Sequence, residues 1–210
     1  MIMYKFTLLR IPAGVRIVLC AIALLLGACA PVRVRENPAA LAAQTARETA
    51  LAKQLQWTIT AHIAVSNGSD GGSGELLWRR DGANYAFSVR APVTGKTWNL
   101  SGDATHAVLE GVDPQPDTDS DPERLLRERL GWDVPLKDLV AWIRGLRAPG
   151  AMASVQYDER NRPAVIEQGG WKIEYRDWFA DRDPVLPRKV FASRGTARVR
   201  VAISQWSLDD

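Results

Sequence analysis

The 210-residue chain is poor in the side chains on which most enzymes and metal sites depend, with two histidines and two cysteines in all. His62 lies beside Thr60 on the polar side of an alternating segment, so we expect it at the surface or at the rim of the fold. The sequence contains neither Gly-x-Ser-x-Gly nor His-Glu-x-x-His. We therefore expect no metal site and no cofactor, and the sequence offers neither of these two hydrolase motifs.

The chain also lacks an apolar run long enough to span a bilayer. Its most apolar stretch, residues 17–26, is about half of the roughly 20 residues that a transmembrane helix needs. This stretch follows Lys5, Arg10 and Arg16 and runs into Leu26-Gly27-Ala28-Cys29, which is typical of a secretory signal peptide. A cysteine directly after Leu-Gly-Ala resembles the lipobox of bacterial lipoproteins, in which that cysteine is acylated and becomes the first mature residue. We therefore expect Cys29 to carry the lipid. Two or more acyl chains on this residue would hold the protein on a membrane durably.

The predicted cleavage divides the chain into a signal peptide that is removed (1–28), a lipidated tether (29–38) and one domain (39–210). The mature part has no excess charge, since the three basic residues of the signal are lost and 24 basic residues then balance 24 acidic ones. This balance argues against nucleic acid as a partner. Cys20 is lost with the signal, so Cys29 is the only mature cysteine and no intrachain disulfide is possible.

Alternating apolar and polar residues after position 56 predict an antiparallel sheet. Strong helix formers predict a helix over residues 39–55 that packs through Leu51 and Leu55, and the glycine-rich segment 67–74 is expected to be a turn. The strands are expected at residues 57–65, 75–80, 85–90, 96–101, 105–110, 153–157, 165–168, 171–176, 188–193 and 198–206. All eight tryptophans lie in this part of the chain, where they can fill a core or line a ligand cavity.

Two short helices are expected between these strands. An acidic, proline-containing loop over residues 113–121 leads to the first helix, which a capping box of Ser120 and Glu123 should open and Gly131 should end. The second begins near Leu136 and ends at Gly145. The fold class is therefore α+β, an incomplete (half) antiparallel β-barrel with short helices over one mouth.

Two segments invite a ligand-binding interpretation that their context does not support. In residues 91–97, Ala91 stands where a phosphate-binding P-loop needs glycine, and the segment joins two strands rather than a strand and a helix. The aspartates of residues 113–121 are interrupted by prolines and lack the glycine and the terminal glutamate of a calcium loop. Neither a nucleotide nor calcium is expected.

Across nearly all of the mature part, the sequence resembles the LolB family of outer-membrane lipoprotein receptors of Gram-negative bacteria. The most specific segment is Leu130-Gly131-Trp132-Asp133-Val134-Pro135-Leu136, followed by Trp142-Ile143-Arg144-Gly145. Further matching segments are Ala91-Pro92-Val93-Thr94-Gly95, residues 168–175, Leu186-Pro187 and Trp206. Their order and spacing behind a lipobox carry the resemblance.

The resemblance implies a non-enzymatic acceptor that is lipid-anchored in the outer membrane and faces the periplasm. Such a protein receives lipoproteins from the soluble periplasmic carrier LolA and holds their acyl chains in an apolar cavity under a lid of short helices. It then inserts them into the inner leaflet of the outer membrane without nucleotide. The implied partners are LolA, the acyl chains of the client lipoproteins and this leaflet, and we expect a monomer.

The resemblance also implies where the site residues lie. An apolar residue at the tip of a loop between two strands serves membrane insertion, and here Val93 stands where leucine is common. Alternation and helix faces suggest the lining of the acyl-chain cavity, although alternation alone does not say which face of the sheet points inward. The expected lining residues are Leu76, Trp78, Tyr85, Phe87, Leu100, Leu126, Leu130, Leu139, Ile143 and Trp171.

Two other functions remain open from the sequence. A half-barrel lipoprotein could instead bind or sense another lipid or apolar ligand of the cell envelope. An envelope hydrolase could use serine and aspartate with His62 or His106, and removal of both histidines would test that role.

Overall fold

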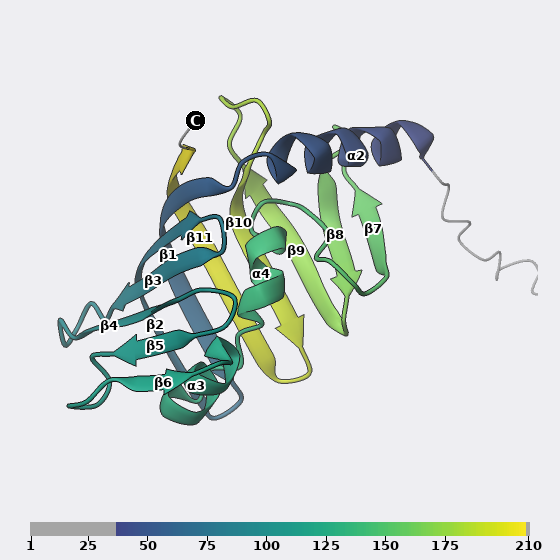
Figure 1. Ribbon diagram of the computed structural model, residues 1–210. Helices are drawn as coiled ribbons and strands as arrows, with labels where there is room; N and C mark the ends of the chain where they lie inside the picture. Colours follow the sequence, from purple (N-terminus) through teal and green to yellow (C-terminus); the bar gives the residue numbers. More distant parts are fainter. Residues whose placement is uncertain (1–36, 209–210) are drawn as a thin grey trace, which may run out of the picture. The chain divides into compact units, whose positions relative to one another are not determined.

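The computed structural model describes residues 37–208, and the predicted signal peptide, Cys29 and most of the tether lie outside them. The described chain forms one eleven-stranded antiparallel sheet and three helices (Figure 1). No helix within residues 37–208 is both long enough and apolar enough to cross a membrane. In chain order the elements are α2 (Pro38–Ala52), β1 (Gln56–Asn67), β2 (Asp70–Asp81), β3 (Asn84–Arg90), β4 (Thr97–Gly102), β5 (Ala107–Glu110), β6 (Asp117–Asp119), α3 (Pro122–Leu130), α4 (Leu136–Trp142), β7 (Ala153–Tyr157), β8 (Pro163–Gln168), β9 (Trp171–Trp178), β10 (Pro187–Arg194) and β11 (Ala197–Leu208).

The sheet is built outward from its centre, where the first and last strands pair. On one side of β1 the chain adds β2 to β6, and on the other side of β11 it adds β10 to β7. The edges β6 and β7 do not pair within the described chain, so the sheet stays open. The chain passes from one edge to the other through α3 and α4, which therefore cross one face of the sheet (Figure 1). The predicted α+β fold, an open antiparallel sheet with short helices, is confirmed.

The central strands bury one face and leave the other in water. In β1, Trp57, Ile59 and Ile63 are at most 1% exposed, whereas His62 is exposed, as predicted. Across the sheet Ile63 pairs with Val201 of β11, which is equally buried. Each large apolar side chain that is fully buried contributes about 1.5–3 kcal/mol to stability. We call this buried side of the sheet the inner face.

The glycine-rich segment 67–74 is mostly strand, so its prediction as a turn is wrong. The turn is only two residues long, and β2 already begins at Asp70. The reason lies in what packs on the strand, since a Cβ added to Gly72 would lie 3.0 Å from Cζ2 of Trp132. Glycine is therefore needed here for the close approach of an indole, not for chain reversal.

Two predictions around α3 also need correction. Residues 117–119 form the edge strand β6 within the predicted acidic loop, and Asp117 pairs with Arg129 of α3 at 2.5 Å. The N-cap of α3 is Asp121 rather than Ser120, because the Asp121 carboxylate accepts a hydrogen bond from the backbone two residues ahead at 3.3 Å. Both aspartates thus hold α3 in place instead of forming a free acidic loop.

The N-terminal helix α2 docks mainly through polar contacts. It ends at Ala52, three residues before the predicted end, so Leu51 is buried but Leu55 is 62% exposed. Glu48 pairs with Arg147 of the segment after α4 at 2.5 Å. The predicted apolar packing therefore holds for Leu51 and is wrong for Leu55, because the chain has already left the helix at that position.

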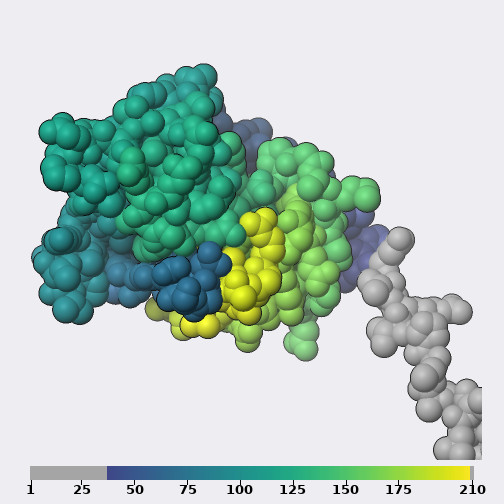
Figure 2. Space-filling view, turned by 90° about the horizontal axis from the view of Figure 1, so that it is seen from below, coloured from purple at the N-terminus to yellow at the C-terminus, as the bar shows by residue number. Residues whose placement is uncertain are grey.

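The two ends of the sheet carry different connections. The loop end carries the β1–β2 turn (68–69), the β3–β4 loop (91–96) and the β10–β11 turn (195–196). Figure 2 views this end, with the segment around α3 (teal to green) against the β1–β2 turn (blue) and the β10–β11 turn (yellow). The opposite end carries the β2–β3 turn, the β4–β5 loop and α2, and we call it the α2 end.

Candidate functional site

Aromatic side chains form a continuous row across the inner face. The ring centroids are 5.3 Å apart for Trp57 and Trp78, 5.1 Å for Trp78 and Phe87, and 5.8 Å for Phe87 and Trp98. The row ends on Trp132, between α3 and α4, whose ring lies 5.2 Å from that of Trp98. The segment that crosses the sheet is thus packed directly on the strands through aromatic contacts.

All ten residues predicted to line the acyl-chain cavity lie in or against the core on the inner face. This placement answers the question that alternation leaves open, namely which face of each strand points inward. Tyr85 and Leu130 are half-buried and pack against the core. The other eight are buried, and they are Leu76, Trp78, Phe87, Leu100, Leu126, Leu139, Ile143 and Trp171. Because these residues form a filled core in this structure, their role in holding an acyl chain stays a prediction.

The helix α4 is held firmly at its C-terminal end. Trp142 Nε1 donates to Gln168 Oε1 at 3.1 Å, and Tyr175 Oη donates to the Trp142 carbonyl oxygen at 2.8 Å. Arg144 donates to a carbonyl oxygen of α2 at 3.1 Å. At the other end, the N-cap Pro135 makes no side-chain hydrogen bond to the helix. Glu123 of α3 instead accepts a hydrogen bond from Lys137 N at 3.0 Å, at an exposed position. The N-terminal end of α4 is therefore held by contacts in water, and its C-terminal end by buried ones.

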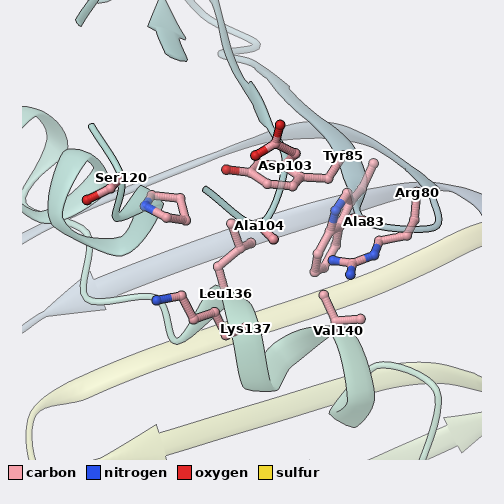
Figure 3. Close-up of a pocket in the computed structure, with 11 residues that line it drawn as sticks. Arg80, Ala83, Tyr85, Asp103, Ala104, Ser120, Leu136, Lys137 and Val140 are labelled. Carbon is pink, nitrogen blue, oxygen red and sulfur yellow. The ribbon is translucent and has the colours of Figure 1, made fainter. Parts of the chain in front are cut away.

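A pocket of about 290 Å³ opens at the α2 end of the sheet, beside the N-terminal end of α4. Its volume is at the lower end of the roughly 300–1,000 Å³ typical of small-molecule sites. In Figure 3, Arg80 and Tyr85 come from the strands, and Leu136 and Val140 face them from α4. The lining residues are Trp78, Arg80, Ala83, Tyr85, Asp103, Ala104, Ser120, Pro122, Leu136, Lys137 and Val140. Two of the ten predicted cavity residues, Trp78 and Tyr85, are among them.

Three polar side chains in this pocket have hydrogen-bonding capacity that the protein itself does not use. Trp78 Nε1 and Tyr85 Oη are buried without a hydrogen-bond partner in the described chain. Burial, with a smaller contribution from the Asp103 carboxylate, raises the pKa of Tyr85 to about 12, so its hydroxyl keeps its proton at neutral pH. Arg80 donates from Nε to the carbonyl oxygen of Gly82 at 2.9 Å. We call this site the donor pocket.

The charge of Arg80 is not balanced by a nearby carboxylate. Asp103 lines the same pocket, but it accepts hydrogen bonds from the backbone of Thr105 at 2.7 Å and of His106 at 3.0 Å, which lower its pKa. Burial lowers the pKa of Arg80. Burial, together with repulsion from Arg80, also lowers the pKa of Arg144 to about 10. A hydrogen-bond acceptor or an anion in the pocket would therefore be stabilised.

Sequence reasoning missed Arg80 as a site residue. Arg80 follows Leu76 and Trp78 at intervals of two, so all three project to the inner face of β2. The signal in the sequence is a basic residue at a position that the alternation assigns to the apolar face of the strand. The sequence predicts Trp78 and Tyr85 as lining residues because of their apolar surfaces. The structure shows in addition that the indole N–H and the phenol hydroxyl have no hydrogen-bond partner in the described chain.

The β3–β4 loop presents an exposed apolar side chain. Val93 is 94% exposed, which agrees with its predicted place at the tip of a loop between two strands. The loop is closed by hydrogen bonds from Ala91 N to Lys96 O at 2.8 Å and from Gly95 N to Ala91 O at 2.9 Å. Gly95 has φ = +67°, a left-handed conformation that a residue with a Cβ rarely adopts. The same hairpin geometry leaves no helix after the segment to bind a phosphate.

The donor pocket and the Val93 loop lie at opposite ends of β3. Tyr85 is the second residue of this strand, and the loop follows its last residue, Arg90. A strand of seven residues spans roughly 23 Å at about 3.3 Å per residue. One strand thus connects a buried polar site at the α2 end with an exposed apolar site at the loop end.

The two histidines lie away from the donor pocket. His62 is exposed in the middle of β1, and His106 is exposed in the β4–β5 loop. Neither lines the donor pocket. Within residues 37–208, no three His, Cys, Asp or Glu side chains come together in a way that could hold a metal ion.

Comparison with known proteins gives consistent matches. The family model described as "Outer membrane lipoprotein LolB" matches residues 55–206. The outer-membrane lipoprotein LolB of Xanthomonas campestris pv. campestris (strain 8004) is 39% identical over 188 residues, covering 87% of this chain and 86% of that protein. The outer-membrane lipoprotein LolB of Xylella fastidiosa (strain Temecula1) is 36% identical over 203 residues, covering 92% and 93%.

Among solved structures, the crystal structure of a LolA superfamily protein from Nitrosomonas europaea resembles this fold with a TM-score of 0.51. The match covers 75% of this chain and 87% of that chain at 12% identity, so it supports the fold alone. The family model and the two relatives extend over most of the chain. This chain belongs to the family of outer-membrane lipoproteins LolB.

Proposed function

We propose that this protein is an outer-membrane-anchored acceptor that receives lipoproteins from the periplasmic carrier LolA and inserts them into the inner leaflet of the outer membrane. Cys29 carries the lipid anchor, and Val93 enters the leaflet during insertion. The acyl chains of the client are held on the inner face of the sheet. The process consists of binding and transfer, so it needs neither a catalytic group nor a nucleotide.

The observation that carries this proposal is an apolar inner face whose cover is a short crossing segment. The residues between the two edge strands contribute Leu125, Leu126, Leu136 and Leu139 to the core. The N-terminal end of α4 is held by exposed contacts from the α3 segment, a hydrogen bond from Lys137 N to Glu123 at 3.0 Å and an ion pair of Lys137 with Asp121, whereas its C-terminal end is tied by buried hydrogen bonds. Displacement of the cover from this solvent-exposed end would open the inner face to an acyl chain while the helix stays attached.

The energies on the two sides of this exchange are of similar size. Removing four leucines from the core costs about 8 kcal/mol, at roughly 2 kcal/mol for each buried side chain. A 16-carbon chain taken out of water gains about 12 kcal/mol, at ~0.8 kcal/mol per CH₂. The net binding of one chain is therefore moderate. Moderate affinity suits an intermediate that must accept an acyl chain and later release it to a bilayer.

The surroundings of Val93 support membrane contact. Arg90 and Lys96 flank the loop and are exposed, and the segment from Arg90 to Lys96 contains no acidic residue. Basic residues at a membrane surface gain about 1 kcal/mol each from anionic lipids. An exposed apolar tip between two cations can thus enter the headgroup region of a leaflet.

The tether keeps the domain close to its anchor. Residues 29–37 reach about 30 Å when fully extended, at roughly 3.3–3.6 Å per residue. This length is comparable to the thickness of a bilayer core. The lipid on Cys29 would therefore hold the described domain within reach of the leaflet that Val93 enters.

Depletion of the protein in its native host tests the proposal. We expect client lipoproteins to accumulate in the periplasm as complexes with the carrier, since the acceptor that unloads it is missing. Wild-type protein supplied in trans should restore localisation. A Cys29→Ser variant, which removes the anchor and leaves the domain unchanged, should still bind client acyl chains but deliver them less selectively to the outer membrane. Normal lipoprotein localisation after full depletion would contradict the proposal.

The alternative of a half-barrel that binds another envelope lipid makes a different prediction. Native mass spectrometry of the protein isolated from its host should show bound lipoprotein if the proposal is correct. A different lipid bound stoichiometrically, with no lipoprotein, would favour the alternative.

A further inference from the structure

The donor pocket contains more unpaired hydrogen-bond donors than a folded protein keeps without a reason. A buried donor or acceptor with no partner costs about 1–3 kcal/mol. Trp78 is fully buried, yet its Nε1–H has no acceptor in the described chain, and the same holds for the buried hydroxyl of Tyr85. Both side chains line the same cavity as the Arg80 guanidinium. The wall of one pocket thus contains two unpaired donors and a guanidinium.

We propose that the donor pocket binds the carbonyl oxygens at the polar end of an acyl group, the ester or amide carbonyls that join fatty acid to a lipoprotein. This inference rests on the proposed function and assigns a binding role to Trp78, Tyr85 and Arg80. The carbonyl oxygens accept hydrogen bonds from the indole N–H, the phenol hydroxyl and the guanidinium. The hydrocarbon part then lies on the apolar inner face.

The composition of the pocket favours a neutral acceptor over a phosphate group. Two of the three donors are neutral, and Lys137, the other cation of the lining, is paired with Asp121 at 3.4 Å. Phosphate and other strong anions are usually held by several cationic or charge-assisted donors. The remaining wall is largely apolar, since Pro122, Leu136 and Val140 contribute to it. An ester or amide at the end of a hydrocarbon chain matches both the donors and the wall.

The position of the pocket gives the bound chain a direction. The pocket lies at the α2 end of the sheet, and the inner face continues from Trp78 through Phe87 and Leu76 toward the loop end. A chain held by its carbonyl at the α2 end would extend its tail toward the end that carries Val93. Leu136 and Val140 of α4, which line the pocket, would have to move aside to admit it.

The test compares two ligands that differ in one carbonyl. Monopalmitoylglycerol carries an ester, whereas 1-O-hexadecylglycerol has the same chain length and glycerol but an ether in place of the ester. The protein is the mature chain from residue 29 with Cys29→Ala, and the dissociation constants are measured by native mass spectrometry and by ligand-induced shifts in Tm. We expect wild-type protein to bind the ester about fivefold to tenfold more tightly than the ether, which corresponds to the loss of about one hydrogen bond.

Tyr85→Phe removes one donor and keeps the ring. This variant should lose about fivefold in affinity for the ester and stay within about twofold for the ether, because only the ester supplies the acceptor. Its stability without ligand should be unchanged or slightly higher, because the substitution removes a buried hydroxyl that has no partner. A merely structural role of Tyr85 would instead weaken both ligands equally.

Arg80→Met removes the cation and keeps an apolar stem. It should lower affinity for the ester several-fold, and Arg79→Met serves as the matched control because Arg79 is the preceding residue of β2 and is exposed. Arg79→Met should bind both ligands as wild type does. The affinity for palmitate, which carries a free carboxylate, is measured in the same experiment. If Arg80→Met weakens palmitate and leaves the ester unchanged, the pocket is a carboxylate site and the inference is wrong.

Two outcomes separate this inference from the proposed function. Equal binding of ester and ether by wild type, with normal delivery of lipoproteins, would overturn the carbonyl site and leave the acceptor role intact. Failure of wild-type protein to bind either ligand or any client acyl chain would overturn both. Selective loss of ester binding in Tyr85→Phe and Arg80→Met supports the inference.

Discussion

The donor pocket and the Val93 loop lie at the two ends of β3 and mismatch their surroundings in opposite ways. Tyr85 and Trp78 place polar atoms in a buried, largely apolar site, whereas Val93 places an apolar side chain almost fully in water. Each arrangement is unfavourable for the isolated protein. An acyl carbonyl would relieve the first and a lipid leaflet would relieve the second. Under the proposed function, lipid would complete this fold at both ends, at one end as a ligand and at the other as a surface.

Val93→Glu is expected to have the largest effect. A carboxylate at the loop tip opposes entry into the leaflet, where moving a charged residue to the bilayer centre costs about 2.5–3.5 kcal/mol. Delivery of client lipoprotein to liposomes should fall at least tenfold, while stability and acyl-chain binding stay as in wild type. The same change at Met152, which is 97% exposed outside this loop, is the matched control and should leave delivery intact. Normal delivery by Val93→Glu would remove the loop from the mechanism.

Val93→Leu tests the same membrane contact by enlarging the apolar surface of the loop tip. Leucine adds one methylene, worth ~0.8 kcal/mol when it is buried in an apolar phase. Binding to liposomes should therefore strengthen about threefold to fourfold, as measured by co-sedimentation. Weaker binding by the leucine variant would argue that the shape of the loop, rather than its apolar surface, makes the contact.

Trp78→Ala is expected to disrupt the donor pocket and the core beside it. Trp78 is a wall of the donor pocket and also the centre of the aromatic row between Trp57 and Phe87. Truncation of a buried tryptophan to alanine costs about 3–5 kcal/mol, so urea unfolding should show a loss of that size. Trp78→Phe keeps most of the packing and should cost much less. A loss below about 1 kcal/mol for Trp78→Ala would show that the row does not support the core.

Replacing each of two tyrosines by phenylalanine compares the stability contribution of a hydroxyl that makes a hydrogen bond with that of one that makes none. Tyr175 donates its buried hydroxyl to the carbonyl oxygen of Trp142 at 2.8 Å, whereas the hydroxyl of Tyr85 has no partner. Tyr175→Phe should therefore destabilise the protein by about 1–2 kcal/mol, and Tyr85→Phe should not destabilise it. Thermal unfolding of both variants checks this difference. Equal losses would mean that Tyr85 has a partner in solution.

The smallest expected effect is the pH dependence of the α2 contact. Burial acts to raise the pKa of Glu48, but hydrogen bonds from Arg147 and Gln44 and the charge of Arg147 outweigh it, so the pKa is lowered. Stability from this pair is present above the pKa of the unfolded chain, near 4.3, and is lost as pH falls through the lower folded value. Because the pair is partly exposed, we expect less than about 1 kcal/mol. Glu48→Gln should abolish this part of the pH dependence in urea titrations between pH 3 and pH 7.

The parts of the fold that sequence reasoning predicts well are those in which one face is buried. The alternation of Trp57, Ile59 and Ile63 predicts β1 because each second side chain has to leave water. Gly131 ends α3 as predicted, with φ = +65°, because a left-handed residue favours glycine. The open sheet and its two short helices follow from such local signals.

The remaining features depend on contacts that are distant in sequence. Gly72 belongs to a strand because Trp132 packs on it, and no local pattern distinguishes this from a glycine turn. Arg80 becomes a site residue because it shares a cavity with the start of α4. The apolar residues of the inner face can be chosen from periodicity, but the lack of partners for Trp78 Nε1 and Tyr85 Oη becomes visible only when their surroundings are known.

Transfer of a client from its carrier tests the central claim most directly. A purified complex of carrier and acylated client is incubated with the mature chain carrying Cys29→Ala, without nucleotide, and the products are resolved by native mass spectrometry. We predict a complex of this chain with the acylated client, together with empty carrier. A non-acylated client should not be transferred. An acylated client that stays on its carrier at every concentration of this chain would contradict the account.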